Sequence, residues 1–438
     1  MSHPGTAPCS SVSEISIRHV AFASVARLCI RQVSRFATRF RTTNVVRKTE
    51  KSETVLRGFR MGRFLRGLRA RSVAKRASVA LAMGYIGLCC ATAQPENPAA
   101  SAESTEASDR VWPSIPDSSF LDNETKAVWK HWSEVAPWLS TEFIKCGPYE
   151  GSTNIPAIRK CQADAFYKTP MYQHLRSRYP VTITSQNIGG ISTEIFLPTQ
   201  GVSSQNSLRV LVNLHGGGFR DGARTLSQLE SIPIASVGRI KVISVDYRMM
   251  PEHAFPAASQ DVEAVYRALI RTYSPKNIGI YGCSAGGVLT AQSIAWFQSK
   301  NLPLPGAIGM FCGAGSYWSE GDSGNFTRLI EERPKSLEDD IYYSYFEHAD
   351  HNDPLAYPVR SPSVMARFPP SLLLTSTRDF ALSSVVYTHT VLVEQNVPAE
   401  LHVWEGLPHG FLMDPDLRQS QEAYDIIAKF FERYLGTE

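Results

Sequence analysis

The stretch IGIYGCSAGG, residues 278–287, is the strongest indication of the fold in this sequence. Its first four residues are mainly apolar and predict a buried strand, and a helical pattern follows up to residue 298. Ser284 stands between the two, inside the pattern GxSxG. The glycines of this pattern leave room for a sharp turn that lifts the serine hydroxyl above the end of the strand. We therefore predict that Ser284 is a nucleophile at a strand–helix turn.

Strand and helix patterns alternate along the chain from about residue 181 onward. Strands rich in Val, Ile and Leu are predicted at residues 208–214, 241–245, 278–281 and 371–375, and helices at 257–272, 287–298 and 383–394. Continuous apolar strands separated by helices indicate an α/β fold with a mostly parallel sheet covered on both faces. A last helix should close this sheet with its apolar stripe, which consists of Ile426, Ile427, Phe430, Phe431 and Tyr434.

A second glycine-rich motif, HGGGF at residues 215–219, follows the predicted strand that ends at Leu214. Because glycine lacks a Cβ, the backbone of such a loop can approach a substrate carbonyl and point its N–H groups at an oxygen that becomes negative. A glycine triplet by itself indicates only a flexible loop. Together with GxSxG further along the chain, it predicts an oxyanion-binding loop.

A serine hydroxyl is a weak nucleophile and needs a general base, which in turn needs an orienting carboxylate. In a sheet of this kind the acid and then the histidine follow the serine along the chain. Asp379 lies a few residues beyond the strand at 371–375, and His409 lies in the loop GLPHGF between a strand pattern at 399–405 and the last helix. We predict Asp379 as the acid and His409 as the base.

Other residues compete for these two roles. Asp353 also lies between the serine and His409, but no strand precedes it, and such sheets place their active residues in loops after strands. The alternative bases are His348, His351, His389 and His402. The first two histidines fall in a loop, and the last two fall within a helix and a strand, where solvated or packed roles suit them better.

Taken together, these motifs resemble those of the hormone-sensitive-lipase-like esterases, also called bacterial family IV lipolytic enzymes, which have the α/β-hydrolase fold. The resemblance covers about residues 181–435. It rests on HGGGF at 215–219, DYR at 246–248, PEHAFPA at 251–257, GCSAGG at 282–287, the region of Asp379, and PHGF at 408–411. The family usually has Asp or Thr before the nucleophile, whereas this chain has Cys283.

The resemblance implies a catalytic triad of Ser284, Asp379 and His409. The oxyanion donors that it implies are the backbone N–H groups of Gly216, Gly217 and Ala285. Such a site cleaves carboxylic esters through an acyl-enzyme intermediate, and the family favours short-to-medium acyl chains or lactones. No cofactor and no metal are implied.

A helical cap over the site is a further expectation from the resemblance. We expect cap helices at residues 113–180, ahead of a catalytic domain at 181–438 that contains a second cap segment at 314–352. Four aromatic residues of that second segment either line a substrate pocket or pack the cap onto the body: Tyr342, Tyr343, Tyr345 and Phe346.

Two other functions are alternatives for a chain with this fold. An amidase or carbamate hydrolase would employ the same triad on a different bond. A small-ligand-binding protein of this fold, of the kind found among gibberellin receptors, would lack the catalytic histidine. The presence of His409 argues against that second alternative.

The net charge of +4 is the sum of the charges of two very different segments. Residues 1–93 contain 17 basic and 3 acidic side chains, whereas the rest of the chain contains 28 basic and 38 acidic ones. From Met61 a basic stretch, a short apolar run and the sequence ATA predict a signal peptide (61–93) with cleavage after Ala93 and a secreted or periplasmic product. A short membrane anchor is the alternative. Residues 1–60 are expected to be a non-native or disordered extension, and residues 94–112 a linker.

Four cysteines follow the predicted cleavage site. Cys146 and Cys161 flank a loop of about 15 residues that a disulfide could close, and the sequence leaves that bridge open. Cys283 and Cys312 lie in apolar contexts that are typical of buried thiols. The expected partner is a small ester substrate, with no nucleic acid and no stable membrane span, and a homodimer is left open.

Overall fold

The structure, a computed structural model, describes residues 116–135, 140–147, 152, 154–317, 319–330 and 345–436. The expected extension (1–60), signal peptide (61–93) and linker (94–112) lie outside these residues and stay predictions. Among the residues that are described, every helix is too short or too polar to cross a bilayer.

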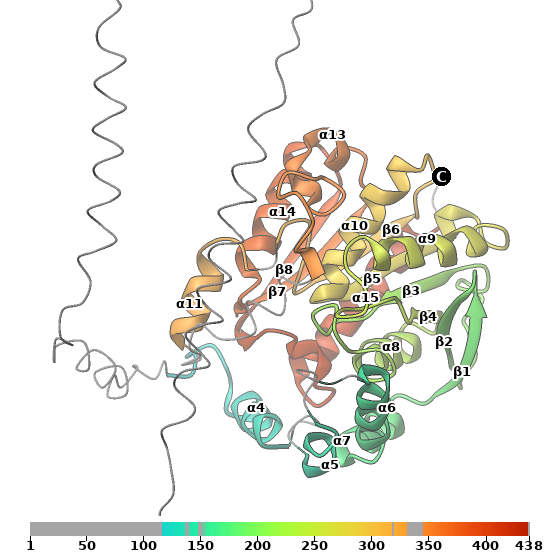
Figure 1. Ribbon diagram of the computed structural model, residues 1–438. Coiled ribbons are helices and arrows are strands. Elements are labelled where there is room, and N and C mark those ends of the chain that lie inside the picture. Colours follow the sequence, from blue (N-terminus) through green and yellow to red (C-terminus); the bar gives the residue numbers. More distant parts are fainter. Residues whose placement is uncertain are drawn as a thin grey trace, which may run out of the picture. The chain divides into compact units, whose positions relative to one another are not determined.

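An eight-stranded sheet forms the centre of the molecule (Figure 1), and its strand order is β1-β2-β4-β3-β5-β6-β7-β8. The strands are β1 (Val181–Ile188), β2 (Ile191–Pro198), β3 (Val210–Leu214), β4 (Lys241–Val245), β5 (Ile278–Cys283), β6 (Ala307–Phe311), β7 (Ser371–Arg378) and β8 (Ala399–Pro408). β2 pairs antiparallel with both β1 and β4. The remaining neighbours, in the order β4-β3-β5-β6-β7-β8, pair in parallel. The predicted α/β class and mostly parallel sheet are confirmed.

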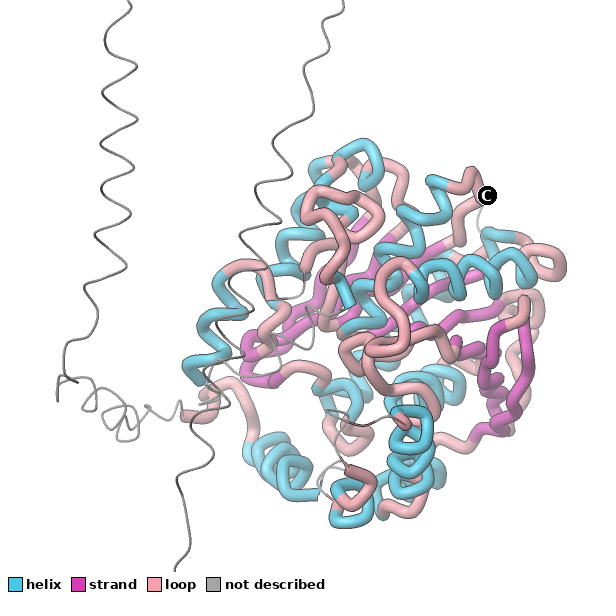
Figure 2. The backbone as a smooth tube through the Cα atoms, in the orientation of Figure 1, coloured by secondary structure: helices cyan, strands magenta, loops and turns pink. Residues whose placement is uncertain are grey.

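Helices cover both faces of the sheet (Figure 2). They are α8 (Leu226–Val237), α9 (Ala257–Leu269), α10 (Ala285–Ser299), α11 (Asp322–Ile330), α13 (Pro362–Met365), α14 (Leu382–Glu394) and α15 (Arg418–Tyr434), with short 3₁₀ turns η2 (Pro275–Asn277), η3 (Pro358–Arg360) and η4 (Phe411–Met413). Val210 and Val212 of β3 pack with residues of α9, α10 and α14, whereas Leu211 packs with residues of α8 and α15. Because side chains alternate along a strand, each face of the sheet has its own apolar core.

The predicted element bounds differ from the observed ones mainly at strand and helix ends. β4 has the predicted bounds, whereas β3 begins two residues late, because Leu208 is exposed and outside the ladder. β5 continues to Cys283 and β7 to Arg378, which brings both strand ends up to the residues that follow them in the site. The helix predicted at 257–272 ends at Leu269.

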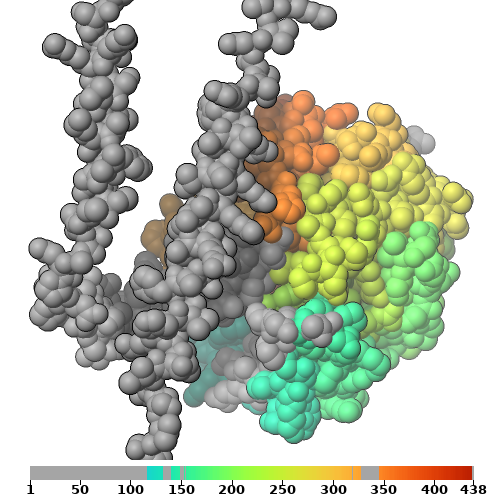
Figure 3. Space-filling model, in the orientation of Figure 1, coloured from blue at the N-terminus to red at the C-terminus, as the bar shows by residue number. Residues whose placement is uncertain are grey.

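Within the described residues, four helices precede the sheet: α4 (Asn123–Val135), α5 (Thr141–Ile144), α6 (Ile155–Phe166) and α7 (Pro170–Arg178). The side chains of Asn154 and Thr169 accept hydrogen bonds from the first turns of α6 and α7, which fixes where these two helices begin. A disulfide joins Cys146 to Cys161 and so ties the end of α5 to α6. Figure 3 shows this teal segment lying directly against the green part of the body. Its role as a cap stays a prediction.

The described part of the second cap segment packs onto the body. Tyr345 is fully buried, and its ring stacks on that of Phe219 with 4.3 Å between centroids. Its hydroxyl accepts a hydrogen bond from the N–H of Ala258 at 3.0 Å. Phe346 is buried beside both rings. Packing is therefore the role of these two residues, and Tyr342 and Tyr343 lie outside the described residues.

Candidate active site

Ser284 lies at a tight turn between β5 and α10, as the GxSxG pattern predicts. Its backbone has φ 58° and ψ −124°, and its N–H donates to the carbonyl oxygen of Phe311 at 2.7 Å. The turn is close to the end of β3, because a Cβ at Gly286 would collide with the carbonyl oxygen of Leu214. Glycine is therefore required at this position, and the turn exposes the serine side chain beyond the sheet.

Ser284, His409 and Asp379 form a continuous line of hydrogen bonds. His409 Nε2 lies 2.9 Å from Ser284 Oγ, and His409 Nδ1 lies 2.7 Å from Asp379 Oδ1. With the imidazole proton on Nδ1, the ring donates to the carboxylate and accepts the serine hydroxyl proton on Nε2. The structure thus brings together the three residues that the sequence predicted.

The carboxyl of Asp379 is buried and fully engaged. Oδ1 accepts from the N–H of Ala381 at 2.8 Å, and Oδ2 accepts from Thr375 Oγ1 at 2.9 Å. Burial alone would raise the pKa of Asp379, but the charge and hydrogen bond of His409, together with these two donors, hold it below its usual value. Asp379 is therefore a carboxylate that can stabilise a protonated imidazole.

Asp353 and His402, two of the competing residues, have other partners. Asp353 turns back on its own loop and accepts from the N–H of Leu355 at 2.8 Å. His402 is paired with Leu374 inside the sheet, and its ring stacks on Trp404. His409 instead has its ring stacked on Phe380, with 4.1 Å between centroids.

The loop after β3 lies against Ser284, but one of its predicted donors is occupied. A Cβ built on Gly216 would lie 3.4 Å from the Cβ of Ser284. The N–H of Gly216 donates to Glu230 Oε1 at 2.8 Å, so it is not available to an oxyanion, and that prediction is corrected. Gly217 has φ +106°, which glycine adopts without strain. The role of Gly217 and Ala285 as oxyanion donors stays a prediction.

His215 and Tyr247 hold the same loop from its other side. His215 Nδ1 lies 2.8 Å from the carbonyl oxygen of Gly216, and Tyr247 donates its hydroxyl to the carbonyl oxygen of His215 at 2.6 Å. The two rings stack with 4.2 Å between centroids. Burial lowers the pKa of His215 to about 4, so its imidazole is neutral near pH 7 and donates through Nδ1.

Comparisons with known proteins match this arrangement. The sequence profile of a family described as having the alpha/beta hydrolase fold matches residues 211–413, a span that contains every residue of the group around Ser284. The chain therefore has the α/β-hydrolase fold.

Individual relatives of this α/β-hydrolase are esterases. A versiconal hemiacetal acetate esterase of Dothistroma septosporum (strain NZE10 / CBS 128990) is 23% identical over 261 residues, which cover 55% of this chain and 77% of the relative. The crystal structure of esterase E25 is 27% identical with a TM-score of 0.62, over 74% of this chain and 97% of that one. The crystal structure of an esterase from the bacterial hormone-sensitive lipase family is 23% identical with a TM-score of 0.58, over 72% of this chain and 99% of that one. The resemblance stated from the motifs is confirmed.

Two buried thiols lie beneath the site of this α/β-hydrolase. Cys283 and Cys312 are free and buried, as predicted, and they are hydrogen-bonded to each other. That bond and burial raise the pKa of Cys283 well above its usual value, so it packs as a neutral thiol. Cys312 Sγ, a carboxyl oxygen of Asp379 and a ring nitrogen of His409 lie within 4.8 Å of one another. Since Asp379 and His409 are hydrogen-bonded to each other, these three residues form an acid–base pair with a thiol beside it.

Sequence reasoning missed two residues of this α/β-hydrolase site, Glu230 and Phe380. Phe380 directly follows the predicted acid, and that position is the only sequence signal that it offers. Glu230 lies on α8, a helix in which nearly every residue is buried, polar ones included. The sequence signal for Glu230 is therefore an acidic residue inside a helix without a solvent-facing side.

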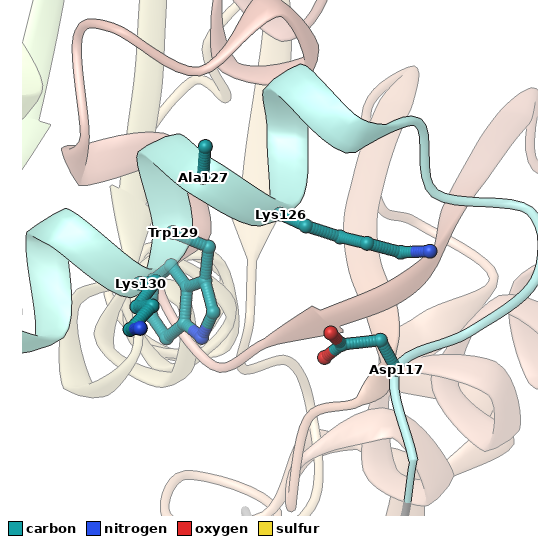
Figure 4. Close-up of a pocket in the computed structure, with 5 residues that line it drawn as sticks. All are labelled: Asp117, Lys126, Ala127, Trp129 and Lys130. Atoms are coloured by element: carbon teal, nitrogen blue, oxygen red, sulfur yellow. The ribbon is translucent and has the colours of Figure 1, made fainter.

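A hollow on the surface lies far from these residues along the chain. Figure 4 shows it beside α4, lined by Asp117, Lys126, Ala127, Trp129 and Lys130. None of these five side chains takes part in the hydrogen-bonded group around Ser284.

Proposed function

We propose that this protein is a serine hydrolase that cleaves carboxylic esters. The observation that carries the proposal is the line of hydrogen bonds from Ser284 Oγ through His409 to Asp379. A serine hydroxyl in this arrangement can lose its proton to the imidazole as it attacks a carbonyl carbon. The esterase names of the relatives support an ester as the substrate class.

The mechanism follows from the proposed roles of these side chains. His409 takes the proton of Ser284, and buried Asp379 orients the imidazole and stabilises its positive charge. Gly217 and Ala285 donate their N–H groups to the oxyanion; Ala285 is the first residue of α10, where an N–H has no acceptor inside the helix. His409 then protonates the departing alcohol, which leaves an acyl group on Ser284 Oγ. Water activated by the same imidazole releases the acid.

The finer substrate assignment is part of the proposal. We expect short-to-medium acyl esters or lactones of small alcohols, because the motifs resemble those of the hormone-sensitive-lipase-like esterases. We also propose that the enzyme is exported to the periplasm or the medium after cleavage behind Ala93. Amino-terminal sequencing of the exported product tests this location; an intact residue 1 would contradict it.

A labelling experiment tests the proposed function. The purified protein should be modified once by a fluorophosphonate, at Ser284, and should hydrolyse p-nitrophenyl esters from acetate to octanoate faster than the matching p-nitroanilides. Ser284→Ala should abolish both labelling and turnover, and Ser293→Ala should retain both, because Ser293 lies two turns further along α10 with its hydroxyl bonded to Leu289. Faster anilide cleavage would favour the amidase alternative. The absence of both labelling and turnover would favour a ligand-binding protein.

A further inference from the structure

Glu230 places a carboxyl group in the core of the molecule directly beneath the loop after β3. Its side chain is buried, with 1% of the residue exposed. Oε1 accepts from the N–H of Gly216 at 2.8 Å, and Oε2 accepts from Asn213 Nδ2 at 2.8 Å. Both partners are uncharged, so no ion pair offsets the cost of burying this carboxyl. Such a group needs an explanation beyond stability.

The contacts of this loop clamp two successive peptide groups. In the peptide between residues 215 and 216, the carbonyl oxygen of His215 accepts from the Tyr247 hydroxyl, and the N–H of Gly216 donates to Glu230. In the next peptide, the carbonyl oxygen of Gly216 faces His215 Nδ1 at 2.8 Å. The carbonyl oxygen and the N–H of one trans peptide point in opposite directions. Fixing the oxygen of Gly216 therefore also fixes the direction of the Gly217 N–H.

The same carboxyl also ties this loop to the strands on either side of it. The backbone N–H of Cys283, the residue before the nucleophile, lies close enough to the Glu230 carboxyl to lower its pKa. Asn213, which holds Oε2, belongs to β3, and its Oδ1 accepts from Ser244 Oγ of β4 at 2.8 Å. Glu230 thus connects α8 with the end of β5 and, through Asn213, with β3 and β4. These are the elements whose relative placement sets the distance between Ser284 and the loop.

We propose that Glu230 is a positioning residue for the reaction at Ser284: its carboxyl holds the Gly216 N–H while His215 holds the Gly216 carbonyl oxygen, and the two contacts together aim the Gly217 N–H at the oxygen that becomes negative. The inference rests on the proposed function and concerns the same site. Glu230 acts through Gly216 and does not touch the substrate. Holding Gly216 requires only an acceptor oxygen, which a carboxylate, a carboxylic acid and an amide all supply.

Three substitutions separate positioning from simple packing. Glu230→Met keeps most of the volume but leaves the Gly216 N–H without its acceptor. Glu230→Gln keeps an acceptor for that N–H, because the Asn213 amide can rotate to accept from the new amide. Gln292→Met is the matched control: Gln292 is also fully buried and holds a loop carbonyl, that of Ala356, at 2.9 Å, but on α10 away from the site.

The readouts are kcat and KM for p-nitrophenyl butyrate and the affinity for a trifluoromethyl ketone, which forms a tetrahedral adduct with the serine. Circular dichroism at the assay temperature checks folding. We expect Glu230→Met to lower kcat and ketone affinity together by about 10- to 100-fold with KM changed less than threefold, since losing an oxyanion donor costs about 10²- to 10³-fold. Glu230→Gln should recover kcat to within about fivefold of the wild type, by the same reasoning. Gln292→Met should lower only the melting temperature.

The inference is overturned if folded Glu230→Met keeps kcat and ketone affinity within twofold of the wild type, or loses them no more than Gln292→Met does. If Glu230→Met does not fold, Glu230→Asp decides, because it keeps the acid but withdraws the acceptor from Gly216. A tenfold fall in kcat at unchanged KM supports the inference, and a change within twofold rejects it. If wild-type protein neither turns over esters nor reacts with the fluorophosphonate, the proposed function itself fails instead.

Discussion

The loops around Ser284 and the helices before the sheet are attached to the same body by different kinds of contact. The loops are held by buried hydrogen bonds to single atoms, as at Asp379 and Gly216. α6 is held to the body by the ion pair of Arg159 and Glu252, whose side chains are 19% and 33% exposed, and the Cys146–Cys161 disulfide joins α6 to the segment after α5. Buried hydrogen bonds fix directions, whereas partly exposed ion pairs and a disulfide mainly fix proximity. Substitutions in the loops should therefore change the rate of the reaction, and substitutions in the helices should change stability.

Asp379→Asn should give the largest effect on the loop side of this comparison. The amide cannot hold the imidazole in the tautomer with its proton on Nδ1, and the loss in kcat for such a change is about 10⁴-fold. Steady-state kinetics with p-nitrophenyl butyrate measures it. Asp353→Asn is the control and should leave kcat within about twofold, by the same argument, because that carboxyl faces its own loop. Equal losses in the two variants would reject the assignment of the acid.

Removal of the disulfide by Cys146→Ser with Cys161→Ser tests the helix side. Closing a loop of 15 residues stabilises the segment by about 3 kcal/mol. We expect faster proteolysis between residues 140 and 166, measured by mass spectrometry of timed digests, with kcat changed little. Ser152→Ala within the same loop serves as the control. A fall in kcat comparable to that of Asp379→Asn would show that these helices position the reacting groups, and the comparison would break.

The loop after β3 should also make the stability of the protein depend on pH, because it lies on the buried carboxyl of Glu230. Burial raises the pKa of Glu230 to about 8 from its usual 4.5. Between these values the folded state binds more protons than the unfolded state, so the free energy of unfolding should fall as pH rises from about 4.5 to about 8. Tyr247, Tyr281 and Cys283, which face this carboxyl, have raised pKa values and stay neutral in that window.

Urea unfolding of the wild type and of Glu230→Gln across that pH range measures this contribution. The difference between their unfolding free energies should carry the slope, because the amide does not titrate. A pH-independent difference would mean that the carboxyl of the folded protein is already ionised throughout this pH range, so that its pKa is not raised.

Arg159→Met should give the smallest effect. Arg159 donates to both carboxyl oxygens of Glu252 and to the carbonyl oxygens of Arg220 and Met250, so it attaches α6 to the loop that contains Gly217. Because the pair is partly exposed, we expect a loss of about 1 kcal/mol in the free energy of unfolding and a small rise in KM at unchanged kcat. Glu252→Gln should cost less, since the amide still accepts from the guanidinium. A clear fall in kcat would instead place Arg159 among the groups that orient the loop.

The residues that could be predicted from the sequence are those whose backbone demands leave a local trace. Ser284 needed glycines around it, and Asp379 and His409 followed strands in an order that the fold imposes. Glu230 left no such trace, because its partner Gly216 is brought to it only when α8 packs against the sheet. α8 itself was not predicted, since a helix buried on nearly every side has no apolar stripe to recognise.

The same reason explains the error at Gly216. A glycine motif indicates that N–H groups can be turned toward a ligand, but it does not say which of them the protein itself uses. The disulfide was left open because two cysteines at a suitable spacing can also remain free, and only the approach of α5 to α6 decides between these outcomes.

The φ of 58° at Ser284 sets stability against activity at a single position. In this conformation a residue with a Cβ lowers the stability of the folded protein by about 1–3 kcal/mol, whereas glycine adopts it without strain. Glycine in turn lowers stability by up to about 1 kcal/mol, because it has more conformational freedom in the unfolded chain. Ser284→Gly should therefore melt at a higher temperature than the wild type while being inactive. The strain at Ser284 is therefore a loss of stability that the turn accepts in order to present a nucleophile.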